Sequence, residues 1–237
     1  KNEKEKGYFQ NFKLENISTD MSFLETLDLL NNKIINETGE EPIAFESDCR
    51  EGICGACSLV INGVPHSKEK GTTICQVHMR KFKNNEKITI EPFRAKPFKI
   101  VKDLIVDRSS MDKIIQNGGY ISVNTGAAQD ANNILIEKKK SDSAFDSAAC
   151  IGCGACIAAC KNSSASLFIG AKITHLINLK QGELEKQERV YNMIKTSEEE
   201  GFGTCSNTRE CEAVCPKDIK ITSINTLNCE FIDYLIN

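Results

Sequence analysis

The apolar residues near the start of the chain follow two different periods. Phe12 and Leu14 alternate with polar residues, which is the period of a half-buried strand. Ser22 and Glu25 then have the spacing of a helix capping box, and apolar residues repeat at helical spacing between positions 23 and 34. The pattern therefore predicts a short strand followed by one amphipathic helix.

Further short strands are predicted before residue 100. Ser58–Ile61 predicts a strand and runs directly into Asn62-Gly63, the dipeptide most typical of a tight hairpin turn. Ile88–Ile90 predicts another short strand, which Pro92 should end. A few strands and one helix indicate a compact α+β unit of about 100 residues.

The second half of the chain has a different composition. Residues 97–107 resemble a connector, and residues 111–116 predict a short helix. Residues 138–142 are charged and should form a solvated loop or a helix end, whereas the chain from Ala148 onward is rich in Ala and Gly and favours helices. We predict two domains, a 2Fe–2S ferredoxin-type domain at 1–105 and a mostly α-helical domain at 106–237. The cofactor of the first domain is predicted from the spacing of its cysteines.

Composition excludes several classes of protein. Of 237 residues, 40% are hydrophobic and 27% are charged, which is typical of a globular protein. A net charge of −3 argues against nucleic acid as a partner. The longest almost wholly apolar stretch, 148–160, is shorter than the 18 or so residues that a membrane span needs. The charged first residues offer no apolar core for a secretory signal.

The chain holds 12 cysteines, and their number and spacing indicate metal binding. Without an export signal, disulfides are not expected, and such densities usually serve metal or redox chemistry. Eleven of them form three groups: Cys49, Cys54, Cys57 and Cys75; Cys150, Cys153, Cys156 and Cys160; and Cys205, Cys211 and Cys215.

The first group has the spacing C-x4-C-x2-C followed by a distant cysteine, which is the plant-type ferredoxin pattern for a 2Fe–2S cluster. Gly52 and Gly55 lie between its cysteines and would let the backbone approach the cluster closely. A structural zinc site also takes four cysteines, but it usually uses two separated C-x2-C pairs, and only Cys54 and Cys57 form one here.

The second group and the third group together resemble a two-cluster bacterial ferredoxin. In such proteins the last cysteine of each run binds the cluster of the other run. This rule assigns Cys150, Cys153, Cys156 and Cys215 to a 4Fe–4S cluster. The remaining site receives Cys160, Cys205 and Cys211 only, because Thr208 stands where the template has a cysteine. Three thiolates predict a 3Fe–4S cluster.

The other candidate residues lack a comparable pattern. Cys229 is expected to be a buried free thiol. Structural or surface roles are expected for His66, His78 and His175. A positively charged rim beside the first cysteines, either solvated or used for docking, could come from Arg50, Arg94, Lys96 and Lys99.

The order of these motifs resembles the iron–sulfur subunit of succinate dehydrogenase and fumarate reductase over essentially the whole chain. The matching stretches are residues 48–57, 150–156 and 211–216. Asp107-Arg108-Ser109 and residues 118–124 resemble the bacterial forms that pair with a menaquinone-linked dihaem cytochrome b. The resemblance implies a β-grasp fold for the first domain and a bacterial-ferredoxin-like fold for the second.

The resemblance also implies a function and partners. A flavoprotein subunit would oxidise succinate at covalently bound FAD, and electrons would pass singly through 2Fe–2S, 4Fe–4S and 3Fe–4S to quinone or haem in a membrane anchor. This chain would carry no dicarboxylate site and no catalytic residue. It would be peripheral, on the cytoplasmic side of the inner membrane, and the direction of the physiological reaction stays open.

Two departures from the ubiquinone-linked branch bear on the electron acceptor. That branch has a histidine where this chain has Ser206, and tryptophans where this chain has Leu167 and Phe168. The departures favour haem or the anchor as acceptor over a quinone site on this chain. The alternatives are a free-standing multi-cluster ferredoxin, the iron–sulfur subunit of another quinone- or thiol-linked reductase, and a zinc-stabilised interaction module.

Overall fold

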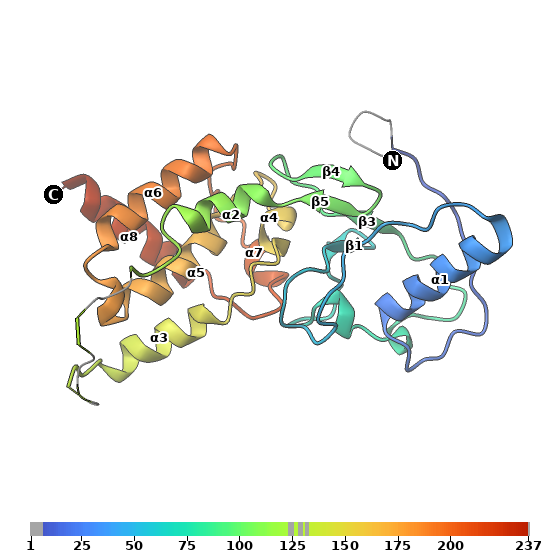
Figure 1. Cartoon of the computed structure of the whole chain (residues 1–237), viewed down its shortest axis with the longest axis horizontal. Helices are drawn as coiled ribbons and strands as arrows, with labels where there is room; N and C mark the ends of the chain where they lie inside the picture. The colour runs from blue at the N-terminus through green and yellow to red at the C-terminus, as the bar shows by residue number, and fades with distance from the viewer. Residues whose placement is uncertain (1–6, 123–125, 128–129, 131–132, 237) are drawn as a thin grey trace.

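The computed structural model describes residues 7–122, 126–127, 130 and 133–236, and the charged residues 1–6 and the motif positions 123–124 lie outside that part. Two regions lie end to end along the long axis of the molecule, one containing α1 and the strands and one made of helices (Figure 1). The first region comprises α1 Phe23–Thr38, β1 Leu59–Ile61, β2 Val64–Pro65, the 3-10 turns Ile74–Gln76 and Met79–Lys81, β3 Ile90–Pro92, β4 Lys99–Lys102 and β5 Ile105–Asp107. The second comprises α2 Ser109–Gln116, α3 Lys138–Ala148, α4 Ala155–Ala159, α5 Ser166–Ile177, the 3-10 turn Lys180–Gly182, α6 Lys186–Glu199, α7 Glu210–Ala213 and α8 Thr222–Ile236.

Helix α1 begins and ends where its sequence predicts. The Ser22 hydroxyl accepts a hydrogen bond from the Glu25 backbone N–H at 3.3 Å, and the Glu25 carboxylate accepts one from the Ser22 N–H at 2.6 Å. Gly39 ends the helix in the left-handed conformation. The apolar face of α1 is buried in a core that also contains Cys57 and Cys75. The helix therefore packs against two cysteines of the first group.

A small antiparallel sheet of order β2-β1-β3 forms the centre of the first region. The predicted hairpin is confirmed, since Ile61 pairs with Val64 across a turn in which Asn62 and Gly63 both have positive φ. The predicted third strand is shifted: it begins at Ile90 and includes Pro92, which pairs with Leu59. Proline is tolerated there because β3 is an edge strand.

Two predictions of local structure are wrong. Phe12 and Leu14 do not belong to a strand. Their alternation is that of an extended segment, because Leu14 packs on the core while Phe12 is exposed. The supposed connector at 97–107 is the hairpin of β4 and β5. All four residues of β4 are exposed, so the sequence does not need to alternate apolar and polar residues there, and the strand is not predicted.

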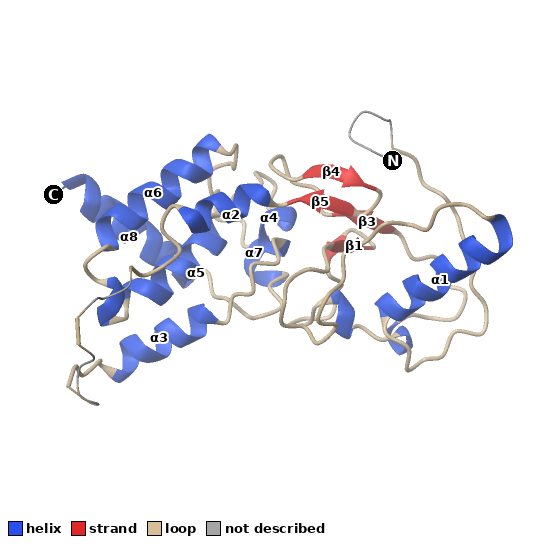
Figure 2. Cartoon of the chain, in the orientation of Figure 1, coloured by secondary structure: helices blue, strands red, loops and turns tan. Residues whose placement is uncertain are grey.

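The second region is mostly helical, as predicted (Figure 2). Helix α5 is almost wholly buried and packs against α3, α6 and α8. The predicted helix at 111–116 is confirmed as α2, and the lysines of 138–142 form the first turns of α3. The cysteines of this region lie in the short helices α4 and α7 and in the segments before and after them.

The two regions share one hydrophobic core. Phe93 and Val106 of the strand region pack together with Met111 and Ile114 of α2 and with Ile157 of α4. The predicted division between residues 105 and 106 falls within β5, beside this core, and stays a prediction. Because the core is continuous, the loops on either side of it are held at a defined separation.

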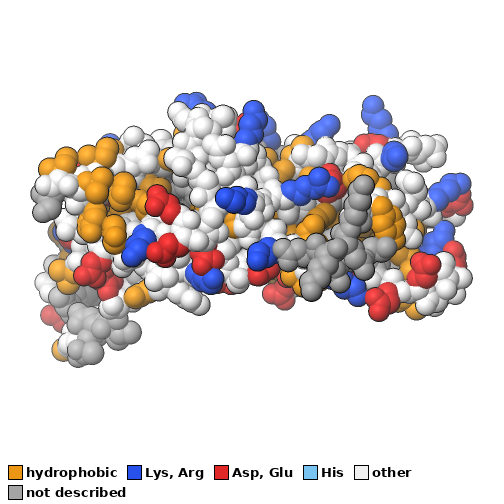
Figure 3. Space-filling view, turned by 90° about the horizontal axis from the view of Figure 1, so that it is seen from above, with side chains coloured by type: hydrophobic (Ala, Val, Ile, Leu, Met, Phe, Trp, Pro, Cys, Tyr) orange, Lys and Arg blue, Asp and Glu red, His pale blue; other side chains and the backbone are white. Residues whose placement is uncertain are grey.

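Apolar side chains also gather on the surface, at the end of the molecule that α6 and α8 form (Figure 3). They include Tyr191 of α6 and Ile232, Leu235 and Ile236 of α8, all exposed. An exposed apolar patch is typical of a surface that another molecule covers. Within the described residues, no helix has the length and apolar character to cross a bilayer.

Candidate metal centres

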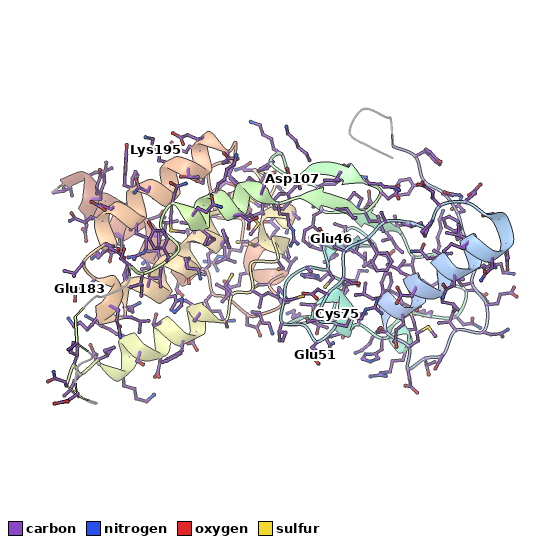
Figure 4. All side chains as sticks on the ribbon, in the orientation of Figure 1. Glu46, Glu51, Cys75, Asp107, Glu183 and Lys195 are labelled. Carbon is purple, nitrogen blue, oxygen red and sulfur yellow. The ribbon has the colours of Figure 1, made fainter. Side chains whose placement is uncertain are left out.

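The first group of cysteines lies in the loop between α1 and β1 and in the 3-10 turn that contains Cys75 (Figure 4). Gly52 and Gly55 have φ of 75° and 73°, a conformation that lets the loop curl around its sulfur atoms. The Glu51 N–H donates to Cys49 Sγ at 3.3 Å, and the Ala56 N–H donates to Cys54 Sγ at 3.4 Å. The loop thus directs backbone N–H groups at sulfur.

The thiols of this group interact with one another in pairs. Hydrogen bonds from the backbone N–H groups of Glu51 and Ile53 lower the pKa of Cys49 to about 7, and Cys54 contributes to that shift. Burial, and then the neighbouring charge of Cys75, raises the pKa of Cys57 to about 12. Cys54 is exposed, so this centre would lie at the surface of the chain.

The second centre is a hollow between α4, α5 and the segment that follows α7. Its cysteines are Cys150, Cys153, Cys156 and Cys215, and the apolar side chains of Phe168 and Ile219 line it too. Its empty volume is about 360 Å³, including space open to solvent. The structure therefore brings Cys215 to the three cysteines of the earlier run.

Burial dominates the electrostatics of the second centre. It raises the pKa of Cys153 to about 12 and that of Cys156 well above its ordinary value, and it also raises the pKa of Cys150 and Cys215. The Ile219 N–H donates to Cys215 Sγ at 3.4 Å, which offsets part of this cost. Thiolates in such a place need a positively charged metal core to compensate them.

The third centre is a hollow that contains Cys160, Cys205 and Cys211 together with Thr208. Its empty volume is about 320 Å³, including space open to solvent, which is similar to that of the second hollow. Burial raises the pKa of Cys211 to about 11. Leu167 lines both hollows and forms an apolar wall between them.

The Thr208 hydroxyl is engaged with a carboxylate. Its hydrogen bond is the main reason that the pKa of Glu210 lies below its ordinary value, and Lys161, 3.7 Å away, acts in the same direction. Thr208 therefore presents a neutral oxygen at the position where the other run presents a thiolate.

Single metal ions are a separate case. Among the described residues, no three or more His, Cys, Asp or Glu side chains are grouped as a single ion would need. In an iron–sulfur cluster, by contrast, the thiolates bind separate iron atoms of one inorganic core. The sulfur atoms around a cluster therefore lie farther apart than the four sulfur atoms around a single zinc ion.

The remaining candidates have local roles. Cys229 is exposed on α8, and the prediction of a buried thiol is wrong because Ile224 and Leu227 form the buried face of that helix. His66 is buried and accepts a hydrogen bond from the Ile74 N–H at 3.4 Å. His66, His78 and His175 line neither hollow.

The predicted positive rim is partly neutralised. Arg50 pairs with Asp28 at 2.6 Å, and Arg94 pairs with Glu91. Sequence reasoning missed a different arginine, Arg108, which donates hydrogen bonds to backbone carbonyls of both the first and the second cysteine loops. Its only sequence signal is its place in the Asp107-Arg108-Ser109 stretch.

Family models match both regions. A 2Fe–2S iron–sulfur cluster binding domain matches residues 1–113, and a 4Fe–4S dicluster domain matches residues 149–219. The predicted order of a 2Fe–2S ferredoxin-type domain and a mostly helical dicluster domain is thereby confirmed.

Relatives with similar sequences include iron–sulfur subunits of succinate dehydrogenase and of fumarate reductase. The succinate dehydrogenase iron–sulfur subunit of Bacillus subtilis is 32% identical over 82% of this chain and 75% of its own length. The fumarate reductase iron–sulfur subunit of Wolinella succinogenes is 28% identical over 92% of this chain and 87% of its own. A subunit of the CoM/CoB fumarate reductase of Methanothermobacter marburgensis is 27% identical over 84% of this chain but only 36% of its own length.

A solved structure has the same fold. The Mycobacterium smegmatis Sdh1 complex in the apo form contains a chain that aligns with a TM-score of 0.60 at 21% identity, covering 89% of this chain and 85% of that one. At this identity the match supports the arrangement of the elements.

Proposed function

The chain belongs to the family of succinate dehydrogenase and fumarate reductase iron–sulfur subunits, and on that premise we propose how its cysteines serve electron transfer. It is an electron-transfer component of such an oxidoreductase. The observation that carries the proposal is the exchange of cysteines between the last two runs. Cys215 lies with the earlier run in one hollow, and Cys160 lies with the later run in the other.

We assign the ligands accordingly. The 2Fe–2S cluster would be held by Cys49, Cys54, Cys57 and Cys75. The 4Fe–4S cluster would be held by Cys150, Cys153, Cys156 and Cys215. The 3Fe–4S cluster would be held by Cys160, Cys205 and Cys211, with Thr208 beside its open corner. Each cluster, when bound, accepts and returns one electron at a time, which divides a two-electron reaction into single steps.

The chain's own residues give these sites different surroundings. The N–H groups of the first loop stabilise negative charge on Cys49 and Cys54 at the protein surface. Apolar residues such as Leu167 and Phe168 surround the second hollow, whereas the third hollow has a largely polar lining. Water exclusion and fixed dipoles limit the reorganisation that accompanies each electron.

The proposed partners are a flavoprotein subunit with FAD and a membrane-anchor cytochrome b, of dihaem type and linked to menaquinone. The exposed Ile53 and Cys54 offer a surface where a flavoprotein could approach the first cluster. The apolar patch on α6 and α8 offers another surface for a partner subunit. Ser206 and the lack of tryptophan favour an acceptor in the anchor, and we place the chain peripherally on the cytoplasmic membrane face.

Metal and sulfide analysis of the anaerobically purified complex tests the proposal. Three clusters require about nine irons and ten sulfides per chain. The complex should also reduce a dye with electrons from succinate. Six or fewer irons, with zinc in place of the remainder, would contradict the ligand assignment.

Fractionation tests the proposed location. Membranes washed with mild salt should retain the chain together with its partner subunits, because the anchor holds it. Recovery of the chain in the soluble fraction with full succinate–quinone activity would instead favour a free-standing electron carrier.

A further inference from the structure

One arginine joins the first and second cysteine loops. Arg108 Nη1 donates a hydrogen bond to the Gly55 carbonyl at 2.8 Å and another to the Cys153 carbonyl at 3.0 Å. Its Nη2 donates to the Ala56 carbonyl at 3.3 Å and to the Glu46 carboxylate at 3.2 Å. A single guanidinium thus contacts the backbone of both loops.

The two loops also touch directly beside this arginine. A Cβ placed on Gly55 would lie 2.5 Å from the Ile151 carbonyl oxygen and 3.2 Å from Cys153 Cα. Only a residue without a side chain permits that approach. Gly55 directly follows Cys54, a proposed ligand of the 2Fe–2S cluster. Its contact with Cys153, a proposed ligand of the 4Fe–4S cluster, therefore brings the two ligand loops together.

The backbone of Arg108 is held in place from both sides. It follows β5, whose last residue Asp107 pairs with Lys99 of β4, and it directly precedes α2. The Asp107 carboxylate accepts a hydrogen bond from the Ser109 N–H at 2.8 Å, which braces the start of that helix. Asp107 and Glu46 lie near the junction of the two regions in Figure 4. The guanidinium therefore starts from a rigid support.

The charge of Arg108 also acts within the strand region, where it adds to the lowering that burial causes in the pKa of His66. The side chain is 21% exposed, so solvent screens this charge only in part.

We propose that Arg108 is the positioning residue of the step between the 2Fe–2S and 4Fe–4S sites: it holds the two loops at one separation, bridges them by hydrogen bonds, and stabilises the negative charge that an arriving electron adds. The inference rests on the proposed function. The electron leaves a reduced 2Fe–2S cluster and reduces an oxidised 4Fe–4S cluster. No covalent bond changes, and Arg108 keeps its protons throughout.

The first test compares Arg108→Gln and Arg108→Lys with the control Arg94→Gln in the purified complex. Arg94 is an exposed arginine paired with Glu91, so its variant changes the net charge equally without touching a cysteine loop. EPR redox titration should show lower cluster potentials in Arg108→Gln, because a nearby positive charge is lost. Arg108→Lys should retain most of the potential, since it keeps the charge, but lysine cannot make the forked set of bonds.

Two further readouts separate bridging from charge. The magnetic interaction between the two reduced clusters should weaken in both Arg108 variants, since the loops lose their shared donor. Quinone-linked turnover, relative to flavin-side dye reduction, should fall about tenfold in Arg108→Gln and partly recover in Arg108→Lys.

A glycine pair tests the bridge without changing any charge. Gly55→Ala and Gly63→Ala both place alanine at a positive φ, but only the first meets another backbone, since nothing lies within 4 Å of a Cβ on Gly63. Gly55→Ala should therefore weaken the magnetic interaction, and Gly63→Ala should leave it unchanged. If Arg108→Gln does not assemble, Arg108→Lys carries the test of the arginine, and this glycine pair tests the direct contact of the two loops.

The outcomes distinguish the two proposals. A wild-type complex without nine irons contradicts the proposed function. A wild-type complex with all three clusters, together with potentials and magnetic interaction in the Arg108 variants equal to those of Arg94→Gln, overturns the role of Arg108 alone.

Discussion

The exposed part of the first cysteine loop and the second hollow hold sulfur in opposite ways. The loop directs backbone N–H groups at Cys49, whose pKa falls to about 7. The second hollow is lined by apolar side chains, and burial raises the pKa of Cys153 to about 12. The loop therefore stabilises the Cys49 thiolate by itself, whereas the sulfurs of the second hollow, like the buried Cys57 of the first group, depend on the metal core to compensate their charge.

The contrast has a consequence for folding. Cys153 belongs to the core that both regions share, while Cys54 lies outside any buried cluster of side chains. Loss of the cofactor from the inner sites should disturb the whole molecule, because metal binding to a buried site contributes to the free energy of folding. Loss of the first cofactor should disturb chiefly the core behind α1, which contains Cys57 and Cys75 but is separate from the shared core.

The largest expected effect comes from replacing one proposed ligand by serine, either in the second hollow or in the first cysteine loop. Cys153→Ser should lose the 4Fe–4S cluster and lower the melting temperature of the chain, with the buried hydroxyl alone costing about 1–3 kcal/mol. Cys54→Ser should lose only about two irons and keep the helical region intact. Iron analysis and thermal unfolding by circular dichroism measure both. Equal losses of stability would refute the contrast.

The second effect concerns the third hollow, which has space for a fourth iron but only three thiols. Thr208→Cys should convert 3Fe–4S to 4Fe–4S, because iron in clusters prefers thiolate to a hydroxyl. The sharp EPR signal of the oxidised 3Fe–4S cluster should disappear, and its potential should shift downward.

The matched control is Ser206→Cys, which adds a thiol to the same hollow away from the template position. It should leave the 3Fe–4S signal in place. An undiminished signal in Thr208→Cys would show that the ligands or the exchange of the two runs are wrongly assigned.

The third effect is a dependence of stability on pH in the strand region. Burial, followed by the charge of Arg108, lowers the pKa of His66 to about 4 in the folded chain, against an ordinary value of 6.5. The unfolded chain therefore binds the extra proton first as the pH falls. The stability due to neutral His66 is complete above pH 6.5 and is lost between about 6.5 and 4, up to about 3 kcal/mol.

His66→Asn should abolish this loss, since asparagine tolerates the positive φ of this position and does not titrate. Anaerobic urea unfolding at pH 7 and pH 5 measures the difference. The half-buried His78 serves as control, and His78→Asn should leave the pH dependence unchanged. A pH dependence that persists in His66→Asn would assign it to another group.

The smallest effect is local to α1. Ser22→Ala removes the hydroxyl that accepts from Glu25 and should destabilise the chain by about 1 kcal/mol. The iron content of the helical region should not change. Ser67→Ala, which removes a similar bond in a turn before Glu69, is the control and should cost less. Loss of inner iron in Ser22→Ala would contradict an effect confined to α1.

Local features were predictable where their hydrogen bonds and backbone angles depend only on a few neighbouring residues. The capping box of α1 and the Asn62-Gly63 turn form because their hydrogen bonds and φ angles involve only neighbouring residues. The exposed strand β4 was missed because a solvated hairpin needs no alternation of apolar residues. Cys229 was misplaced because its burial depends on which face of α8 meets α5 and α6.

The sequence by itself determined the chemistry of this protein, because cysteine spacing is a covalent property of the chain and iron–sulfur cores demand thiolates at such intervals. It also places Thr208 at the position where the other cysteine run has a cysteine. Only the tertiary structure decided how the sites relate to one another. The bridge from Arg108 to Gly55 and Cys153 joins residues about 50 positions apart along the chain. Such a contact arises from the packing of the shared core, and no local pattern encodes it.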